Sequence, residues 1–347
     1  MMSDYRYESR SYQPYFGFGE LGLVGNQQEL EAQGRLPAGY RFEGKHYFWN
    51  AASEHTTTAI GNCLYEHNLS RYRPQDVDAV DAARRIFVLG GSLAVGTSAS
   101  TKENSWHAVL ERLLAQRFPL WAPHVFNCAM GGFISTQEML ALFIAVLPRK
   151  PYGVIFLNGL NDIYQPWQLG TRPGDPYNLS TVMKYWYERP FVHGQMDEAA
   201  LQSLRRQAQI LLYDTEKRDI VRRSIVNVYL DNMTRSIRLC QAADVKVAVC
   251  FQPWLDRSRH LLGLEYLDEA STAHQETFEL IRRRMTELHG DVFRDLTGIF
   301  NRLDQLPWYT DVVHVDDRGQ ELLGHAVAEV VQPWFGGDHA VAANHGR

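Results

Sequence analysis

The sequence predicts an α/β protein with three layers, in which a sheet of about five parallel strands has helices on both faces. Two observations lead to this prediction. Short apolar runs alternate with segments of helical periodicity throughout residues 85–331, as in chains that form a doubly wound sheet. The run at residues 86–89 is also unbroken (Ile-Phe-Val-Leu), which is typical of a parallel strand that is buried on both faces.

Residues that end strands follow the first, second and fourth expected strands. Gly90 and Gly91 follow the first strand, Gly131 and Gly132 follow the second, and Pro253 comes soon after the fourth. Glycine permits a tight turn out of the sheet, and proline removes a donor from the ladder. The five expected strands are residues 86–89, 123–130, 152–157, 245–251 and 291–296.

Helices are expected between these strands, because apolar side chains recur there at three- and four-residue spacing. In the first of them Trp106, Val109, Leu110 and Leu113 follow this spacing, and Pro119 ends the segment. The expected helices cover residues 103–118, 135–147, 201–213, 220–243, 268–289 and 320–331.

The main domain is expected at residues 85–335, with two flanking parts and one insertion. Residues 1–84 are rich in aromatic side chains and predict an N-terminal extension that packs on the core. Residues 164–190 form an aromatic insertion, which is interpreted either as a lid or wall of a binding site or as a surface insertion. A flexible tail is expected at residues 336–347.

The composition favours a cytoplasmic protein of ordinary globular type. With 35 basic and 40 acidic residues the formal net charge is −5, which gives no argument for nucleic acid as a partner. No apolar run reaches the length of a membrane span, and no leader-like segment follows Met1. Four separated cysteines and the lack of C-x-x-C or H-E-x-x-H patterns predict neither a metal site nor a cofactor. No pattern specifies an oligomeric state.

The turn that carries Ser92 has several interpretations when it is considered alone. Gly91 and Gly96 have the spacing of a phosphate-binding loop, but Thr97 stands where that loop needs lysine. The segment lacks the second glycine of the dinucleotide fingerprint. It also lacks the last glycine of the nucleophile elbow, because Ala94 occupies that position. A catalytic serine at the start of a helix and an ordinary strand-to-helix turn both remain open.

Further polar residues and glycines follow the other strands, and they belong at the same edge of the sheet as Ser92. Gly132 follows the second expected strand, Asn161 follows the third, and Asp311 and His314 precede the last helix. Ligands bind at this edge in open α/β sheets. A serine ester hydrolase needs a nucleophile, an imidazole, a group that orients it and oxyanion donors, and the set supplies each. Helix capping is the alternative for Asn161 and Asp311.

These residues resemble the four motifs of the SGNH (GDSL-type) hydrolase family over residues 85–331. The first motif, Gly-Asp-Ser-Leu, is Gly90-Gly91-Ser92-Leu93 here, so glycine replaces the aspartate. The third and fourth motifs, Gly-x-Asn-Asp and Asp-x-x-His, are matched fully by the segments at residues 159–162 and 311–314. The glycine of the second motif corresponds to Gly132.

The resemblance implies a role for each of these residues. Ser92 is the expected nucleophile, His314 the general base and acid, and Asp311 the residue that orients His314. The backbone N–H groups of Ser92 and Gly132 and the side-chain amide of Asn161 are the expected oxyanion hole. Asp162 is expected to be structural and to hold its loop.

The expected activity is hydrolysis of a small-molecule or carbohydrate ester through a covalent acyl-enzyme. An O-acyltransferase that uses the same residues is an alternative, because an acceptor hydroxyl can replace water in the second step. A non-catalytic binding protein that has kept the fold is a further alternative.

Overall fold

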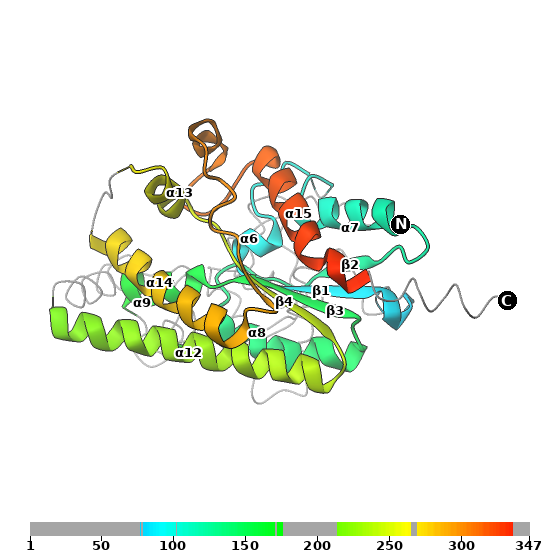
Figure 1. Ribbon diagram of the computed structural model, residues 1–347, viewed down its shortest axis with the longest axis horizontal. Helices are drawn as coiled ribbons and strands as arrows, with labels where there is room; N and C mark the ends of the chain where they lie inside the picture. The colour runs from blue at the N-terminus through cyan, green and yellow to red at the C-terminus, as the bar shows by residue number, and fades with distance from the viewer. Residues whose placement is uncertain are drawn as a thin grey trace, which may run out of the picture.

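A single parallel sheet lies at the centre of the described part of the chain (Figure 1). A computed structural model describes residues 77, 79–101, 103–170, 172–175, 214–264 and 269–335. The strands, all paired in parallel, are β1 (Arg85–Gly90), β2 (His124–Asn127), β3 (Gly153–Asn158), β4 (Lys246–Phe251) and β5 (Phe293–Asp295). The predicted three-layer α/β/α fold with about five parallel strands is confirmed.

The order of the strands fixes where a ligand binds. The sheet runs β2-β1-β3-β4-β5, so the chain moves outward from β1 to β2 and then returns to place β3 on the other side of β1. This is the flavodoxin-like order, in which the direction of winding reverses beside the first strand. In proteins with this strand order, ligands bind outside the carboxyl ends of the strands at the reversal, which here are β1 and β3. Gly90 and its register partner Leu157 lie at that point.

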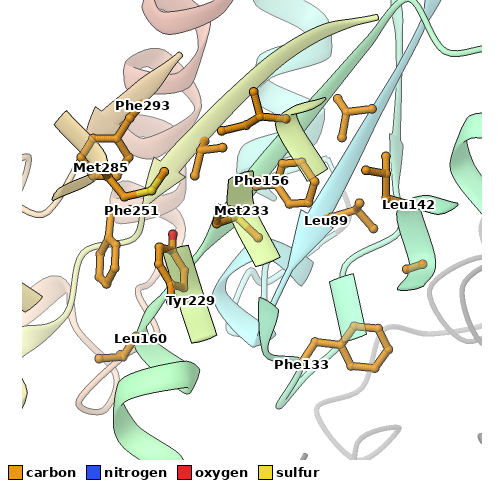
Figure 2. Packing of buried hydrophobic residues seen from close by; sticks show 14 of the residues in the cluster. Leu89, Phe133, Leu142, Phe156, Leu160, Tyr229, Met233, Phe251, Met285 and Phe293 are labelled. Atoms are coloured by element: carbon orange, nitrogen blue, oxygen red, sulfur yellow. The ribbon is translucent and has the colours of Figure 1, made fainter. Parts of the chain in front are cut away.

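Alternate side chains of β1 enter two separate cores. Phe87 and Leu89 belong to the larger cluster, part of which is shown in Figure 2, whereas Ile86 and Val88 belong to the second cluster with Trp106. The unbroken apolar run therefore satisfies both faces of the sheet. The first face is covered by α8 (Ser135–Ala141), α9 (Leu160–Leu169), α12 (Thr215–Ala242) and α14 (Glu269–His289), and the second by α7 (Trp106–Arg117) and α15 (Asp317–Val331).

The start of the predicted insertion at residues 164–190 is helical. It forms the second half of α9. Ile163 and Trp167 lie four residues apart on one side of that helix, and both are buried in the larger core. Burial of these two side chains outweighs the hydrogen bond that Pro166 removes from the helix. Residues 176–190 lie outside the described residues.

Two other helical segments differ from the expectation. The helix expected at residues 135–147 is divided, because α8 passes into a π-helical segment at Leu142–Val146 and then into a 3-10 turn at Leu147–Arg149. The short helix α13 (Leu255–Leu261) was not predicted, since its seven residues carry no sustained apolar period. The helix expected at residues 201–213 falls outside the described residues.

Most of the two predicted flanking parts, residues 1–84 and 336–347, also falls outside the described residues. Val77 is described and belongs to the larger core cluster. Within the described ranges, no helix combines the length and the apolar character that crossing a membrane requires. The same ranges contain no group of three or more His, Cys, Asp or Glu side chains that could hold a metal ion.

Candidate active site

The turn that carries Ser92 begins at Gly90, a position that only glycine can occupy. Gly90 ends β1 with φ 154°, and a Cβ atom there would lie 2.1 Å from the carbonyl oxygen of Leu157 on β3. The four-residue helix α6 (Ser92–Val95) begins immediately after this turn and ends at Gly96, which has φ 85°. Ser92 is thus held at the carboxyl edge of the sheet, at the start of a helix.

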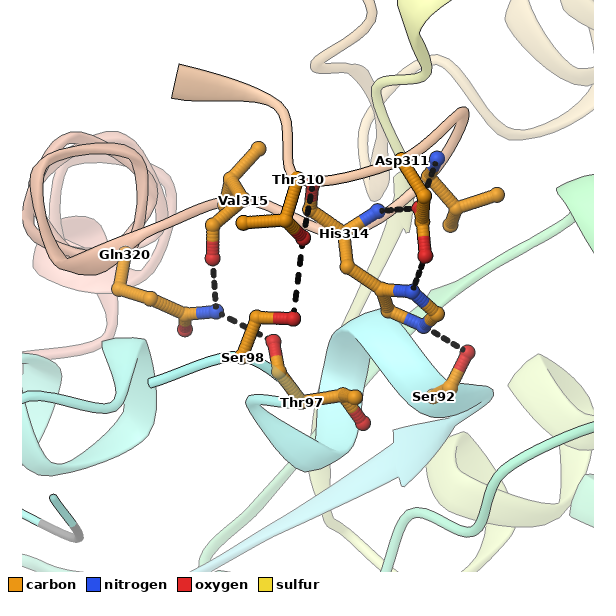
Figure 3. Close-up of polar contacts among 9 residues, drawn as sticks. Ser92, Thr97, Ser98, Thr310, Asp311, His314, Val315 and Gln320 are labelled. Carbon is orange, nitrogen blue, oxygen red and sulfur yellow. Dashed lines mark hydrogen bonds and ion pairs between the residues drawn. The ribbon is translucent and has the colours of Figure 1, made fainter. Parts of the chain in front are cut away.

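A series of hydrogen bonds joins Ser92, His314 and Asp311 (Figure 3). His314 Nε2 lies 2.7 Å from Ser92 Oγ, and His314 Nδ1 lies 2.6 Å from Asp311 Oδ2. The other carboxylate oxygen, Oδ1, accepts the backbone N–H groups of Val313 and His314, each at 2.7 Å. The aspartate is therefore fixed by the backbone of its own loop while its free oxygen faces the imidazole.

The ionisation of Asp311 determines which nitrogen of His314 carries the proton. Partial burial raises the pKa of Asp311, but hydrogen bonds from His314, its charge and the backbone N–H groups lower this pKa to about 2. At neutral pH the carboxylate can only accept, so Nδ1 of the neutral imidazole must donate. Nε2 is then left with a lone pair toward the hydroxyl of Ser92, as a general base requires.

The loop that carries His314 is braced against neighbouring elements. Tyr309 and Val315 form an antiparallel bridge across it, and Thr310 N–H donates to the carbonyl of His314 at 2.8 Å. Val312 accepts at 2.9 Å the backbone N–H of Leu255, the first residue of α13. The short unpredicted helix thus helps to hold the imidazole in place.

Gln320, on α15, joins this loop to the turn that carries Ser92 (Figure 3). Its Nε2 donates to the carbonyl oxygens of Thr97 at 3.1 Å and Val315 at 3.3 Å, and its Oε1 accepts Trp106 N–H at 3.0 Å. The side chain is fully buried and all of its polar groups are used. Sequence reasoning identified Gln320 only as the expected start of a helix, because its partners are distant in the chain.

The structure places Asn161 and the loop of Gly132 beside the same turn. Gly132 has φ 74°, and its carbonyl accepts Gln165 Nε2 at 2.7 Å. The amide of Asn161 donates to the carbonyl of Phe133 at 2.8 Å. Space for a Cβ on Gly91 is occupied by the Nδ2 atom of Asn161, at 2.4 Å. All five of the predicted site residues are therefore brought to one edge of the sheet.

Gln165 is a second residue that sequence reasoning missed. It lies four residues after Asn161 on α9, so the two side chains share one side of the helix and bind successive carbonyls, those of Gly132 and Phe133. The i, i+4 spacing indicates this pairing only when both residues lie on one helix, whereas the sequence analysis assigned the segment from residue 164 to an aromatic insertion.

Asp162 binds the chain at Ser135, shortly after Gly132. Its carboxylate accepts the backbone N–H of Ser135 at 3.0 and 3.1 Å and also the hydroxyl of Ser135, at the start of α8. These are contacts of the structural kind that was expected of Asp162. Burial raises its pKa to about 7 against the opposing effect of the Ser135 hydrogen bonds. Glu138, a second buried carboxyl, also has a raised pKa, because of burial and then the charge of Asp162.

Asp162→Asn is expected to flatten the pH dependence of stability. The folded protein holds the proton of Asp162 up to about pH 7, whereas the unfolded chain releases it near pH 4, so this group loses stabilising effect as the pH rises through that window. The difference in free energy of unfolding between wild type and Asp162→Asn should change by up to about 4 kcal/mol between pH 4 and 7. Urea denaturation across this range measures it, with the exposed Asp231→Asn as the matched control. If the free energy of unfolding has the same pH dependence in wild type and Asp162→Asn, the raised pKa of Asp162 is contradicted.

The sheet order and the contacts of Ser92, His314 and Asp311 are those that a hydrolase of the serine type requires. A model of the GDSL-like Lipase/Acylhydrolase family matches residues 88–322, which is more than half of the chain. The chain therefore belongs to this family, and the predicted enzyme class, a GDSL-type carboxylic-ester hydrolase, is confirmed. A comparison with curated proteins gives no match.

Several solved structures resemble the chain at low sequence identity. The acetyl xylan esterase AlAXEase has 16% identity and a TM-score of 0.44, over 72% of this chain and 99% of that one. A catalytic mutant of Axe2, an acetylxylan esterase from Geobacillus stearothermophilus, has 12% identity and a TM-score of 0.47, over 73% of this chain and 95% of that one. The lipase Lip_vut3 from a goat rumen metagenome has 13% identity and a TM-score of 0.42, over 71% of this chain and 96% of that one. Since these TM-scores are below 0.5, the assignment rests on the family model.

Proposed function

We propose that this chain hydrolyses the ester of a small molecule or a carbohydrate through a covalent acyl-enzyme on Ser92. The observation that carries the proposal is the unbroken series from Ser92 Oγ to His314 Nε2 at 2.7 Å and from His314 Nδ1 to Asp311 Oδ2 at 2.6 Å. A non-catalytic binding protein has no need of these reacting groups in mutual contact.

In the first step Ser92 Oγ attacks the acyl carbonyl carbon while its proton passes to His314 Nε2. Asp311 remains ionised and stabilises the imidazolium ion. The negative oxygen of the tetrahedral intermediate faces the N–H groups of Ser92 and Gly132 and the amide of Asn161. His314 then gives its proton to the departing alcohol oxygen, which leaves the acyl group esterified to Ser92.

In the second step a water molecule replaces the alcohol. His314 Nε2 takes a proton from the water as its oxygen attacks the acyl carbon, and the same oxyanion donors face the new intermediate. Collapse returns the proton to Ser92 Oγ and releases the carboxylic acid. An acyltransferase would differ only here, because an acceptor hydroxyl would take the place of water.

Hydrolysis of 4-nitrophenyl acetate tests the proposed function. The purified protein should release 4-nitrophenol with saturation kinetics, and prior treatment with a fluorophosphonate should abolish the release. Added acceptor alcohols should leave free acetate as the main product, whereas acetylated alcohol as the main product would favour the acyltransferase. Failure of the folded protein to turn over any short-chain aryl ester would contradict the proposal.

A further inference from the structure

Gly91 is not required by the conformation of its backbone. Its φ of −86° and ψ of −159° are those of extended backbone, which every residue type adopts without strain. It differs in this respect from its neighbour Gly90, whose φ is 154°. The reason for glycine at position 91 must therefore be the space around it.

That space is occupied by the amide of Asn161. A Cβ atom on residue 91 would lie 2.4 Å from Asn161 Nδ2 and 3.4 Å from Asn161 Cγ, whereas the carbonyl oxygen of Phe133 would be at an ordinary 3.6 Å. Real Cβ atoms essentially never approach another heavy atom to 2.4 Å. A side chain of any kind at position 91 thus requires the amide to move.

The amide of Asn161 is held on its other side by a hydrogen bond. Nδ2 donates to the carbonyl of Phe133 at 2.8 Å, and Gln165 fixes the preceding carbonyl, that of Gly132, at 2.7 Å. One N–H of the amide is committed to Phe133, and the other is left for a ligand. The amide is therefore confined between the nucleophile turn and the loop of Gly132.

We propose that Gly91 is a positioning residue for the oxyanion hole: its lack of a side chain keeps the Asn161 amide in the position from which it stabilises the negative oxygen. This inference rests on the proposed function. The family motifs Gly-Asp-Ser-Leu and Gly-x-Asn-Asp combine an aspartate at this position with the asparagine, so the restriction arises from where the Asn161 amide lies in this chain, 2.4 Å from the Cβ position of residue 91.

The size of the effect follows from the geometry. Relief of a 2.4 Å contact to an ordinary contact of 3.4 Å requires a movement of about 1 Å at the amide nitrogen. A misplacement of about 1 Å in a catalytic group costs on the order of 100-fold in rate, and complete loss of one oxyanion donor costs about 100- to 1000-fold. Gly91→Ala should therefore lower kcat by about 10- to 100-fold with little change in KM, because the lost interaction acts in the transition state.

A double-mutant cycle tests the proposal, with Gly91→Ala, Asn161→Ala and the double variant compared on 4-nitrophenyl acetate. Once Asn161 is alanine, the added methyl group has no amide to displace, so Gly91→Ala should then change kcat by less than about twofold. Gly298→Ala is the matched control, since its Cβ would meet only Leu261 Cδ1 at an ordinary 3.7 Å. This control should keep the wild-type kcat.

Thermal unfolding of the same variants supplies a readout that does not depend on activity. Gly91→Ala should lower Tm in the wild-type background and leave it nearly unchanged in the Asn161→Ala background, even if the single variant folds poorly. Wild-type kcat in Gly91→Ala, or an equal loss of kcat in both backgrounds, would overturn the positioning role alone. An inactive but folded wild-type protein would instead overturn the proposed function on which it rests.

Discussion

Ser92→Ala is expected to lower kcat for aryl-ester hydrolysis by about 10⁵- to 10⁶-fold. The substitution removes the oxygen that attacks the substrate and leaves His314 Nε2 without the partner that it has at 2.7 Å. Removal of the nucleophile in serine hydrolases leaves only the catalysis that the oxyanion hole and substrate binding provide. Steady-state kinetics on 4-nitrophenyl acetate measures the loss, and the spontaneous rate sets its lower limit.

A nearby serine provides the control for this prediction. Ser100 Oγ bonds to the carboxylate of Asp317 and is not part of the series that ends at Asp311. Ser100→Ala should keep kcat within a few-fold of the wild type. Activity above about 1% of the wild type in folded Ser92→Ala would show that another group is the nucleophile.

Asp311→Asn is expected to lower kcat by about 10⁴-fold while the protein stays folded. An ionised aspartate can only accept, which keeps the proton of the neutral imidazole on Nδ1. The amide of asparagine can donate to Nδ1 instead, and this leaves Nε2 protonated and unable to take the proton of Ser92. The control is Asp304→Asn, an exposed aspartate that pairs with Arg302.

The same pair of variants gives a second readout at low pH. Because the pKa of Asp311 is lowered to about 2 in the folded protein, its stabilising effect is complete above about pH 4 and is lost as the pH falls toward 2. Asp311→Asn should lack this part of the acid transition, and Asp304→Asn should retain it. Identical acid transitions for wild type and Asp311→Asn, followed by far-UV circular dichroism, would contradict the account.

The fold was predictable from the sequence because it depends on local patterns. Unbroken apolar strands, glycines at strand ends and helical periodicity each lie within one short segment. Parallel pairing then brings all strand carboxyl ends to one edge, so the positions of Ser92, Gly132 and Asn161 follow from the topology. Asp311 and His314 are three residues apart, and their contact is also local.

The residues that support the site were not predictable in the same way, because their partners are remote in sequence. Gln320 binds the carbonyl of Thr97, which lies 223 residues earlier, and no pattern within one segment indicates this contact. The importance of Gly91 becomes visible only when Asn161 is placed beside it. In the sequence the same glycine was only a departure from a motif.

Covalent labelling is the most direct test of the central claim that Ser92 is the nucleophile of an acyl-enzyme. The folded protein should react with a fluorophosphonate to give a single adduct. Mass spectrometry of its peptides should locate the adduct on Ser92, and Ser92→Ala should remain unlabelled. A folded wild-type protein that forms no adduct, or forms it on a different residue, would contradict the claim.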